Sequence, residues 1–261
     1  MKTRLLTGLV AAFMALVIGV GGTARPAQAV VPWGQIAVAV ASYLFSGSGG
    51  GSGDLERAKQ EIIAAINASR QEMLNHIDAI ANADVRACTE AATTLVAQID
   101  LMDQFTLAAF VINAVNCATL SSAYFDAVQN LGSADNIGNL MGVIYSIAMV
   151  GFAKLGFPTV DLLDGLIRGY DAVVRKLTPP CVTSLLGVGP GGPYPGNLYT
   201  AWTKCTAYNG DTGVTSRSVV WPPTSNPFDI EGAQQVATRN TSRPVALTAL
   251  PTLRQLRAAM P

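Results

Sequence analysis

The segment from Asp54 to Leu131 contains neither glycine nor proline over 78 residues, and this absence restricts the possible folds more than any other feature of the chain. Glycine and proline are the strongest local breakers of helices, so an alanine-rich stretch without them favours helix throughout. We therefore expect a mainly α protein, an antiparallel helical bundle with a long first helix that begins at the N-cap residue Asp54. Apolar residues recur close to whole helical turns along this segment and form one stripe: Leu55, Ile62, Ile66, Met73, Ile77, Ile80, Cys88, Leu95, Ile99 and Met102.

Charge divides the expected bundle, residues 54–178, into two kinds of helix. Residues 54–103 carry 13 charged side chains, whereas residues 104–153 carry only Asp126 and Asp135. The first helix should therefore have a solvated face, and the later helices should be enclosed by others. We expect a turn near residue 102, with Asp100 or Asp103 starting the second helix.

Two further helices are expected before the bundle ends. Residues 132–136 are typical of a loop, and Ile137–Leu155 is predicted to be a helix that stops before Gly156 and Pro158. Residues 160–177 form the next predicted helix, which has acidic residues in its first turns and basic residues in its last.

Composition changes at residue 179, because 11 of the 14 prolines lie from there to the end. Residues 179–261 should therefore form a Pro/Gly-rich layer that packs on the bundle, is pinned by a disulfide and contains short strands. We expect a hairpin of residues 198–208 and 214–221 that turns at Asn209-Gly210. Short helices are expected at residues 231–239 and 252–260.

The first 29 residues have the three parts of a secretory signal peptide. Lys2 and Arg4 form a positive start, an apolar stretch follows, and Ala27-Gln28-Ala29 forms a small-x-small cleavage site before Val30. We therefore expect a secreted, extracellular protein. Cleavage would leave 14 basic and 17 acidic residues, a balance that does not suggest a nucleic-acid binder.

Residues 30–53 form the expected start of the mature chain. An uncharged apolar segment, residues 30–45, precedes a Gly/Ser linker that ends at Gly53. The segment is short for a membrane span, so it should either dock on the main body or contact a partner or a membrane surface.

Four cysteines in an exported chain indicate disulfides, and four cysteines allow three pairings. We favour Cys88 with Cys117 and Cys181 with Cys205, because each pair closes a short segment. A turn near residue 102 would also place Cys88 and Cys117 side by side across an antiparallel pair. The cysteine spacing fits no zinc pattern and the chain has a single histidine, so we expect no metal and no cofactor.

Candidate catalytic groups each have a structural explanation. Glu72 and His76 lie four residues apart on one helical face, as solvated pairs often do. Two carboxylate pairs, Asp100/Asp103 and Asp161/Asp164, could serve glycoside hydrolysis or hold a cation, but they also lie where helices should begin. We therefore predict no catalytic residue, and an extracellular hydrolase that uses acidic residues stays the alternative.

Two uncharged segments, residues 105–125 and 137–153, carry the more specific functional hypothesis. Such a pair could be a membrane-inserting hairpin, and Gly138, Gly142 and Ser146 form a small-residue ridge that permits close helix approach. Polar residues such as Asn113 and Asn116 favour burial in a soluble bundle instead. Both possibilities stay open at this point.

The phrases NASRQEM, NCATLSSAYF and IRGYDAVVRKL resemble uncharacterised secreted proteins of high-GC Gram-positive bacteria, a resemblance that implies no known activity. In layout alone, the chain is similar to α-helical pore-forming toxins. The sequence therefore predicts a secreted, non-catalytic protein that acts by contact with an unknown protein partner, the cell envelope or a membrane.

Overall fold

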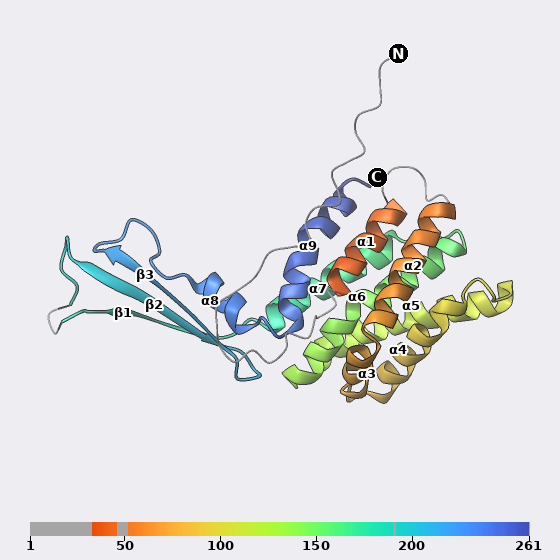
Figure 1. Cartoon of the computed structure of the whole chain (residues 1–261), viewed down its shortest axis with the longest axis horizontal. Coiled ribbons are helices and arrows are strands. Elements are labelled where there is room, and N and C mark those ends of the chain that lie inside the picture. The colour runs from red at the N-terminus through yellow and green to blue at the C-terminus, as the bar shows by residue number, and fades with distance from the viewer. Residues whose placement is uncertain (1–32, 46–51, 190–191, 261) are drawn as a thin grey trace, which may run out of the picture. The chain divides into compact units, whose positions relative to one another are not determined.

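The computed structural model describes residues 33–45, 52–189 and 192–260 (Figure 1). The expected signal peptide, residues 1–29, and most of the Gly/Ser linker lie outside these residues. The described part of the chain is mainly helical, and a three-stranded antiparallel sheet stands between α7 and α8. The elements are, in chain order, α1 (Trp33–Phe45), α2 (Ser52–Ala68), α3 (Arg70–Asp78), α4 (Ala83–Leu95), the 3-10 helix η1 (Val96–Gln98), α5 (Gln104–Ala127), α6 (Leu131–Lys154), α7 (Val160–Lys176), β1 (Cys181–Leu186), β2 (Leu198–Thr206), β3 (Thr212–Val220), α8 (Ile230–Ala237) and α9 (Ser242–Ala258).

Helix α6 forms the centre of the bundle and contacts α1, α5, α7 and α9. Every residue from 137 to 151 is buried, as expected of a helix that others enclose. At Gly142 a β-carbon would lie 2.4 Å from the Tyr170 hydroxyl oxygen and 2.6 Å from the Trp33 carbonyl oxygen. The small residues of α6 therefore permit close approach by α1 and α7 within the protein.

Helix α1 docks on the bundle, which was one of the two alternatives for the apolar N-terminal segment. It packs on α6, α2 and α9. The side chains of Trp33, Val40 and other residues of its inner face are buried. Because this face is part of the core, α1 does not offer it to a partner or a membrane in this structure.

The long first helix runs through α2 and α3 and ends at Asp78, earlier than the sequence predicts. The helical hydrogen-bond pattern continues through the irregular residue Ser69, whose amide donates to Ala65 and whose carbonyl accepts from Met73. The chain then turns, and Asn82 caps a new helix, α4, by accepting hydrogen bonds from two backbone amides at 3.0 Å.

The predicted loop at residues 132–136 is wrong, because these residues belong to α6. The helix begins at Leu131, and the Asn130 side chain accepts a hydrogen bond from the Ser133 amide at 2.9 Å. Glycine near a helix start is tolerated when such a cap satisfies the free amides. The third of the expected bundle helices therefore starts about two turns earlier than predicted.

The C-terminal region contains the predicted hairpin, with β2 and β3 joined through Asn209 and Gly210. Gly210 has a φ of 85°, a left-handed conformation that suits a tight turn. The sequence analysis missed β1, which pairs with β2 and places Cys181 opposite Cys205. Helix α8 lies against the sheet at Gly213, where a β-carbon would approach the Ala233 carbonyl oxygen to 2.0 Å.

Helix α9 starts at Ser242. This is ten residues before residue 252, where the sequence predicts the closing helix to begin. Thr241 caps it by accepting from the Arg243 amide. Pro251 lies inside the helix, and proline is a frequent reason to end a helix in sequence-based prediction. Packing of α9 on α7 and α1 stabilises the continuous helix in spite of the missing donor.

Candidate functional site: a groove between α4 and α5

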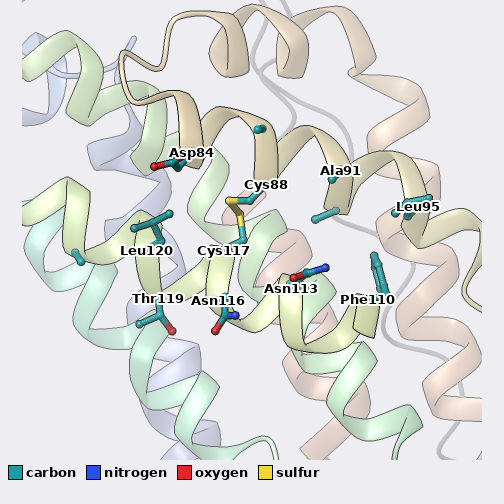
Figure 2. A pocket seen from close by; sticks show the side chains of 14 residues that line it. Asp84, Cys88, Ala91, Leu95, Phe110, Asn113, Asn116, Cys117, Thr119 and Leu120 are labelled. Atoms are coloured by element: carbon teal, nitrogen blue, oxygen red, sulfur yellow. A yellow bond between two sulfur atoms is a disulfide. The ribbon is translucent and has the colours of Figure 1, made fainter. Parts of the chain in front are cut away.

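Helices α4 and α5 enclose a groove of about 720 Å3 on the outside of the bundle. Figure 2 shows Asp84 near one end of the α4 wall and Leu95 near the other, with the Cys88–Cys117 disulfide bridging the helices between them. The disulfide joins Cα atoms 5.5 Å apart, as the predicted hairpin register requires. This volume falls in the range of small-ligand pockets, roughly 300–1,000 Å3.

Local signals fix the position of the two walls. Asn82 caps α4, and Asp103 caps α5 by accepting from the amides of Phe105 and Thr106 at 2.9 Å each. These bonds hold the pKa of Asp103 below its ordinary value, with the Thr106 amide as the main cause. Of the two candidate start residues for α5, the structure therefore selects Asp103.

The groove has almost no charge. Asp84 is the one charged side chain among its 14 lining residues, and the disulfide sulfurs, alanines and leucines supply most of the surface. A second hollow of about 430 Å3 continues from Leu95 toward the turn between η1 and α5. Such a lining offers no set of convergent polar groups for catalysis.

The outward face of α5 is as apolar as its inward face. No charged residue occurs from 104 to 125, although the helix lies at the surface. Phe105 is 90% exposed, Leu101 in the preceding turn 86% and Ile112 59%. We call Leu101, Met102 and Phe105 the tip. Surface helices ordinarily place charged residues outward, so this face is unusual for one that remains in water.

The candidate base His76 packs between α3 and α6. Its Nδ1 lies 2.6 Å from Oδ1 of Asn136, which accepts a hydrogen bond from the ring, and its Nε2 lies 3.9 Å from Glu72. The Asn136 amide donates to the Gly132 carbonyl oxygen in turn. The expected Glu72/His76 pair is present on α3, and the bond to Asn136 ties His76 to α6. Neither Glu72 nor His76 lines the α4–α5 groove.

The two candidate carboxylate pairs are each divided by the fold. Asp100 accepts from Lys154 of α6 and Lys59 of α2, and these hydrogen bonds lower its pKa, Lys154 most strongly. Its partner in sequence, Asp103, is the cap of α5. Asp100 therefore ties the turn to the bundle and is not free for chemistry.

Asp164 and Asp161 face different neighbours. Asp164 accepts a hydrogen bond from Nε of Arg257 in α9 at 2.8 Å. Asp161 lines a cleft of about 650 Å3 between α5 and α7, which Asp126 and Arg168 also line. Tyr145 lies in the same cleft, 2.8 Å from the Ser122 hydroxyl, and burial raises its pKa. The structure does not bring the two acids together.

The cysteines are all paired, Cys88 with Cys117 and Cys181 with Cys205, as favoured from the sequence. Within the described residues, no group of three or more histidine, cysteine, aspartate or glutamate side chains is placed to hold a metal ion. The disulfides are consistent with an oxidising, extracellular environment.

Two helices, α5 and α6, are long and apolar enough to cross a membrane by length and composition. They differ in burial, since 83% of the apolar window of α6 is buried and 39% of that of α5. Periodicity could not reveal this difference, because both helices are apolar all round. Sequence reasoning therefore missed the outward face of α5 as a candidate site. The sequence feature that could have indicated it is the absence of charged residues from 104 to 125.

Comparison of the chain with protein-family models, curated proteins and solved structures finds no match.

Proposed function

We propose that this protein is exported and acts by non-catalytic contact with an apolar target, namely a protein partner, the cell envelope or a membrane, through α4 and α5. The observation that carries the proposal is the uncharged outward face of α5 with its exposed tip. Exposed apolar patches on soluble proteins mark sites of protein or membrane contact.

The export part of the proposal rests on the predicted signal peptide, residues 1–29, and is supported by the two disulfides. A disulfide crosslinks the floor of the α4–α5 groove, so the contact surface keeps its shape in the extracellular medium. Residues 104–125 of α5 carry no charge, so contact of this helix with an apolar target avoids the desolvation penalty that charged groups would add.

The tip supports contact with a lipid surface most directly. Transfer of an exposed leucine or phenylalanine side chain out of water is favourable by about 1.5–3 kcal/mol each. Asp100 precedes the tip and pairs with Lys59 and Lys154, whereas Asp103 lies within the tip and accepts hydrogen bonds from backbone amides. The charge of Asp100 is therefore neutralised, and that of Asp103 is stabilised by hydrogen bonds.

Co-sedimentation of the mature chain with neutral and anionic vesicles tests the membrane form of the proposal. We expect binding, and we expect the double variant Leu101→Ser/Phe105→Ser to weaken it at least about 10-fold through the lost apolar transfer. The matched control is Val182→Ser/Leu198→Ser in the sheet, where both side chains are 67% exposed. Failure of the wild-type chain to bind any vesicle would rule out a membrane as the target. Equal weakening of vesicle binding by both double variants would show that the tip is not the contact site.

An extracellular hydrolase remains the second candidate, and one observation favours it. Asp161 and Asp126 line the α5–α7 cleft, and neither has an ion-pair partner among the described residues. Two carboxylates in one cleft could act as acid and base in glycoside hydrolysis. A screen of secreted-hydrolase substrates at high protein concentration tests this, with Asp161→Asn as the inactive variant. Activity unchanged in that variant would contradict the assignment.

A further inference from the structure

We infer that a second copy of this chain covers the outward face of α5, in a two-fold dimer that packs the α4–α5 face of one copy against that of the other. The inference goes beyond contact with an apolar target, because it names a partner for the groove and does not depend on the tip binding anything.

A heptad seam on α5 is the first observation. The residues on its outward face are spaced by four and three in alternation, the pattern by which helices pair side by side. All six are exposed: Phe105, Ala109, Ile112, Asn116, Thr119 and Ala123. We call this set the seam. In a helix of a monomer, such positions would carry charge on the solvent side.

The polar members of the face are self-complementary. Asn116 lies near the middle of the seam, and Asn113 lines the groove beside it. Neither side chain has a hydrogen-bond partner within the part of the chain that the structure describes. An amide carries both donors and an acceptor, so the asparagines of two copies can satisfy one another across a two-fold axis. A lipid interior would leave them unpaired.

The shape of the face suits a helix of the same kind. Ala87 and Ala91 on α4 and Ala109 and Ala123 on α5 keep the surface low, which permits close approach of a second helix. Ile112 stands out from the seam with 59% of its side chain exposed. In the dimer it fills the depression that the alanines of the other copy leave.

The area of the face reaches the lower limit for a specific dimer. Helix α5 has 24 residues and α4 has 13, which correspond to about 36 Å and 20 Å of helix about 10 Å wide. The face therefore offers roughly 550 Å2 in projection, so two copies would together bury about 1,100 Å2. A specific interface should bury at least about 1,000 Å2 in total, and this face just reaches that limit. Asp84, at one end, adds the only charge that lines the groove, so two copies do not repel each other strongly.

Sedimentation equilibrium of the mature chain over micromolar concentrations, with the disulfides intact, tests the inference. We expect twice the mass of one chain. Ile112→Glu places like charges across the interface and should raise the dissociation constant on the order of 100-fold. Asn116→Asp has the same shape as the native residue, lies on the surface and should act in the same direction. The control is Val182→Glu on β1, which is 67% exposed and should leave the dimer unchanged.

A single-chain mass for the wild type at every concentration would overturn the inference. A dimer that survives both seam variants would overturn it as well, because the interface would then lie elsewhere. Circular dichroism of each variant shows that it is folded. Vesicle binding is a separate readout: a monomer that binds vesicles through the tip leaves the proposed function intact, and a dimer that binds none refutes only the membrane target.

Discussion

Asp135 holds the C-terminal region to the bundle, and its removal gives the sharpest test of the packing described above. The carboxylate lies in α6 and is 6% exposed. It accepts hydrogen bonds from the Ser242 amide at 2.6 Å, from the Ser242 hydroxyl at 2.7 Å and from the Tyr208 hydroxyl at 2.7 Å. One side chain thus joins α6, the start of α9 and the turn between β2 and β3.

The magnitude follows from these three bonds. A hydrogen bond to a charged group contributes about 1.5–3 kcal/mol. We use the lower end, because Asp135→Ala also removes a carboxylate that is costly to bury, and expect the free energy of unfolding to fall by about 4 kcal/mol. Asp135→Asn keeps an acceptor for Ser242 but loses the charge, and should cost about 1–2 kcal/mol.

Urea unfolding followed by tryptophan fluorescence and circular dichroism measures both variants. Native-state hydrogen exchange should show the largest loss of protection at Ser242, whose amide loses its acceptor. A loss below about 0.5 kcal/mol in Asp135→Ala, the usual range for surface substitutions, would refute this account of the contact, as would equal losses in the two variants.

Three further predictions concern single contacts within the fold. Gly142→Ala should cost about 1–3 kcal/mol in urea unfolding, because the new methyl group would lie 2.4 Å from the Tyr170 hydroxyl oxygen. Burial and the hydrogen bond to Asp135 raise the pKa of Tyr208, so its contribution to stability is complete below the ordinary value of 10.0 and is lost as the pH rises further; Tyr208→Phe should reduce the alkaline slope of unfolding free energy. Replacing Cys181 and Cys205 together by alanine opens a loop whose ends are separated by 24 residues, and the lower melting temperature should correspond to about 3.4 kcal/mol on the chain-entropy model.

The sequence predicts those parts of the fold that local chemistry determines. Absence of glycine and proline predicts the helices, and the position of the turn near residue 102 predicts the Cys88–Cys117 pairing. Asn209-Gly210 predicts the hairpin, because only residues that tolerate positive φ fit such a turn. The helix and hairpin signals act within a few residues of the structure that they specify, and the disulfide follows from the turn that joins two predicted helices.

The parts that sequence reasoning missed depend on tertiary contacts. The continuation of α9 through Pro251 is stabilised by packing on α7 and α1, which no local pattern reports. The end of the first helix after Asp78 had a local signal in Asn82, a good N-cap residue, but the apolar stripe continues past it and concealed the turn. Edge strand β1 is specified by its pairing with β2, in a register that places Cys181 opposite Cys205.

The candidate site shows why composition could not decide between core and surface. Helices α5 and α6 have nearly the same length and almost the same lack of charge. Helix α6 contacts α1, α2, α3, α4, α5, α7 and α9, so its apolar faces are all used in folding. Helix α5 packs mainly on α4, α6 and α7, and this leaves Ile112 and the rest of the seam exposed. Folding does not require an uncharged seam at that surface, because charged residues there would cost the bundle nothing; the seam therefore points to contact with something outside the folded chain.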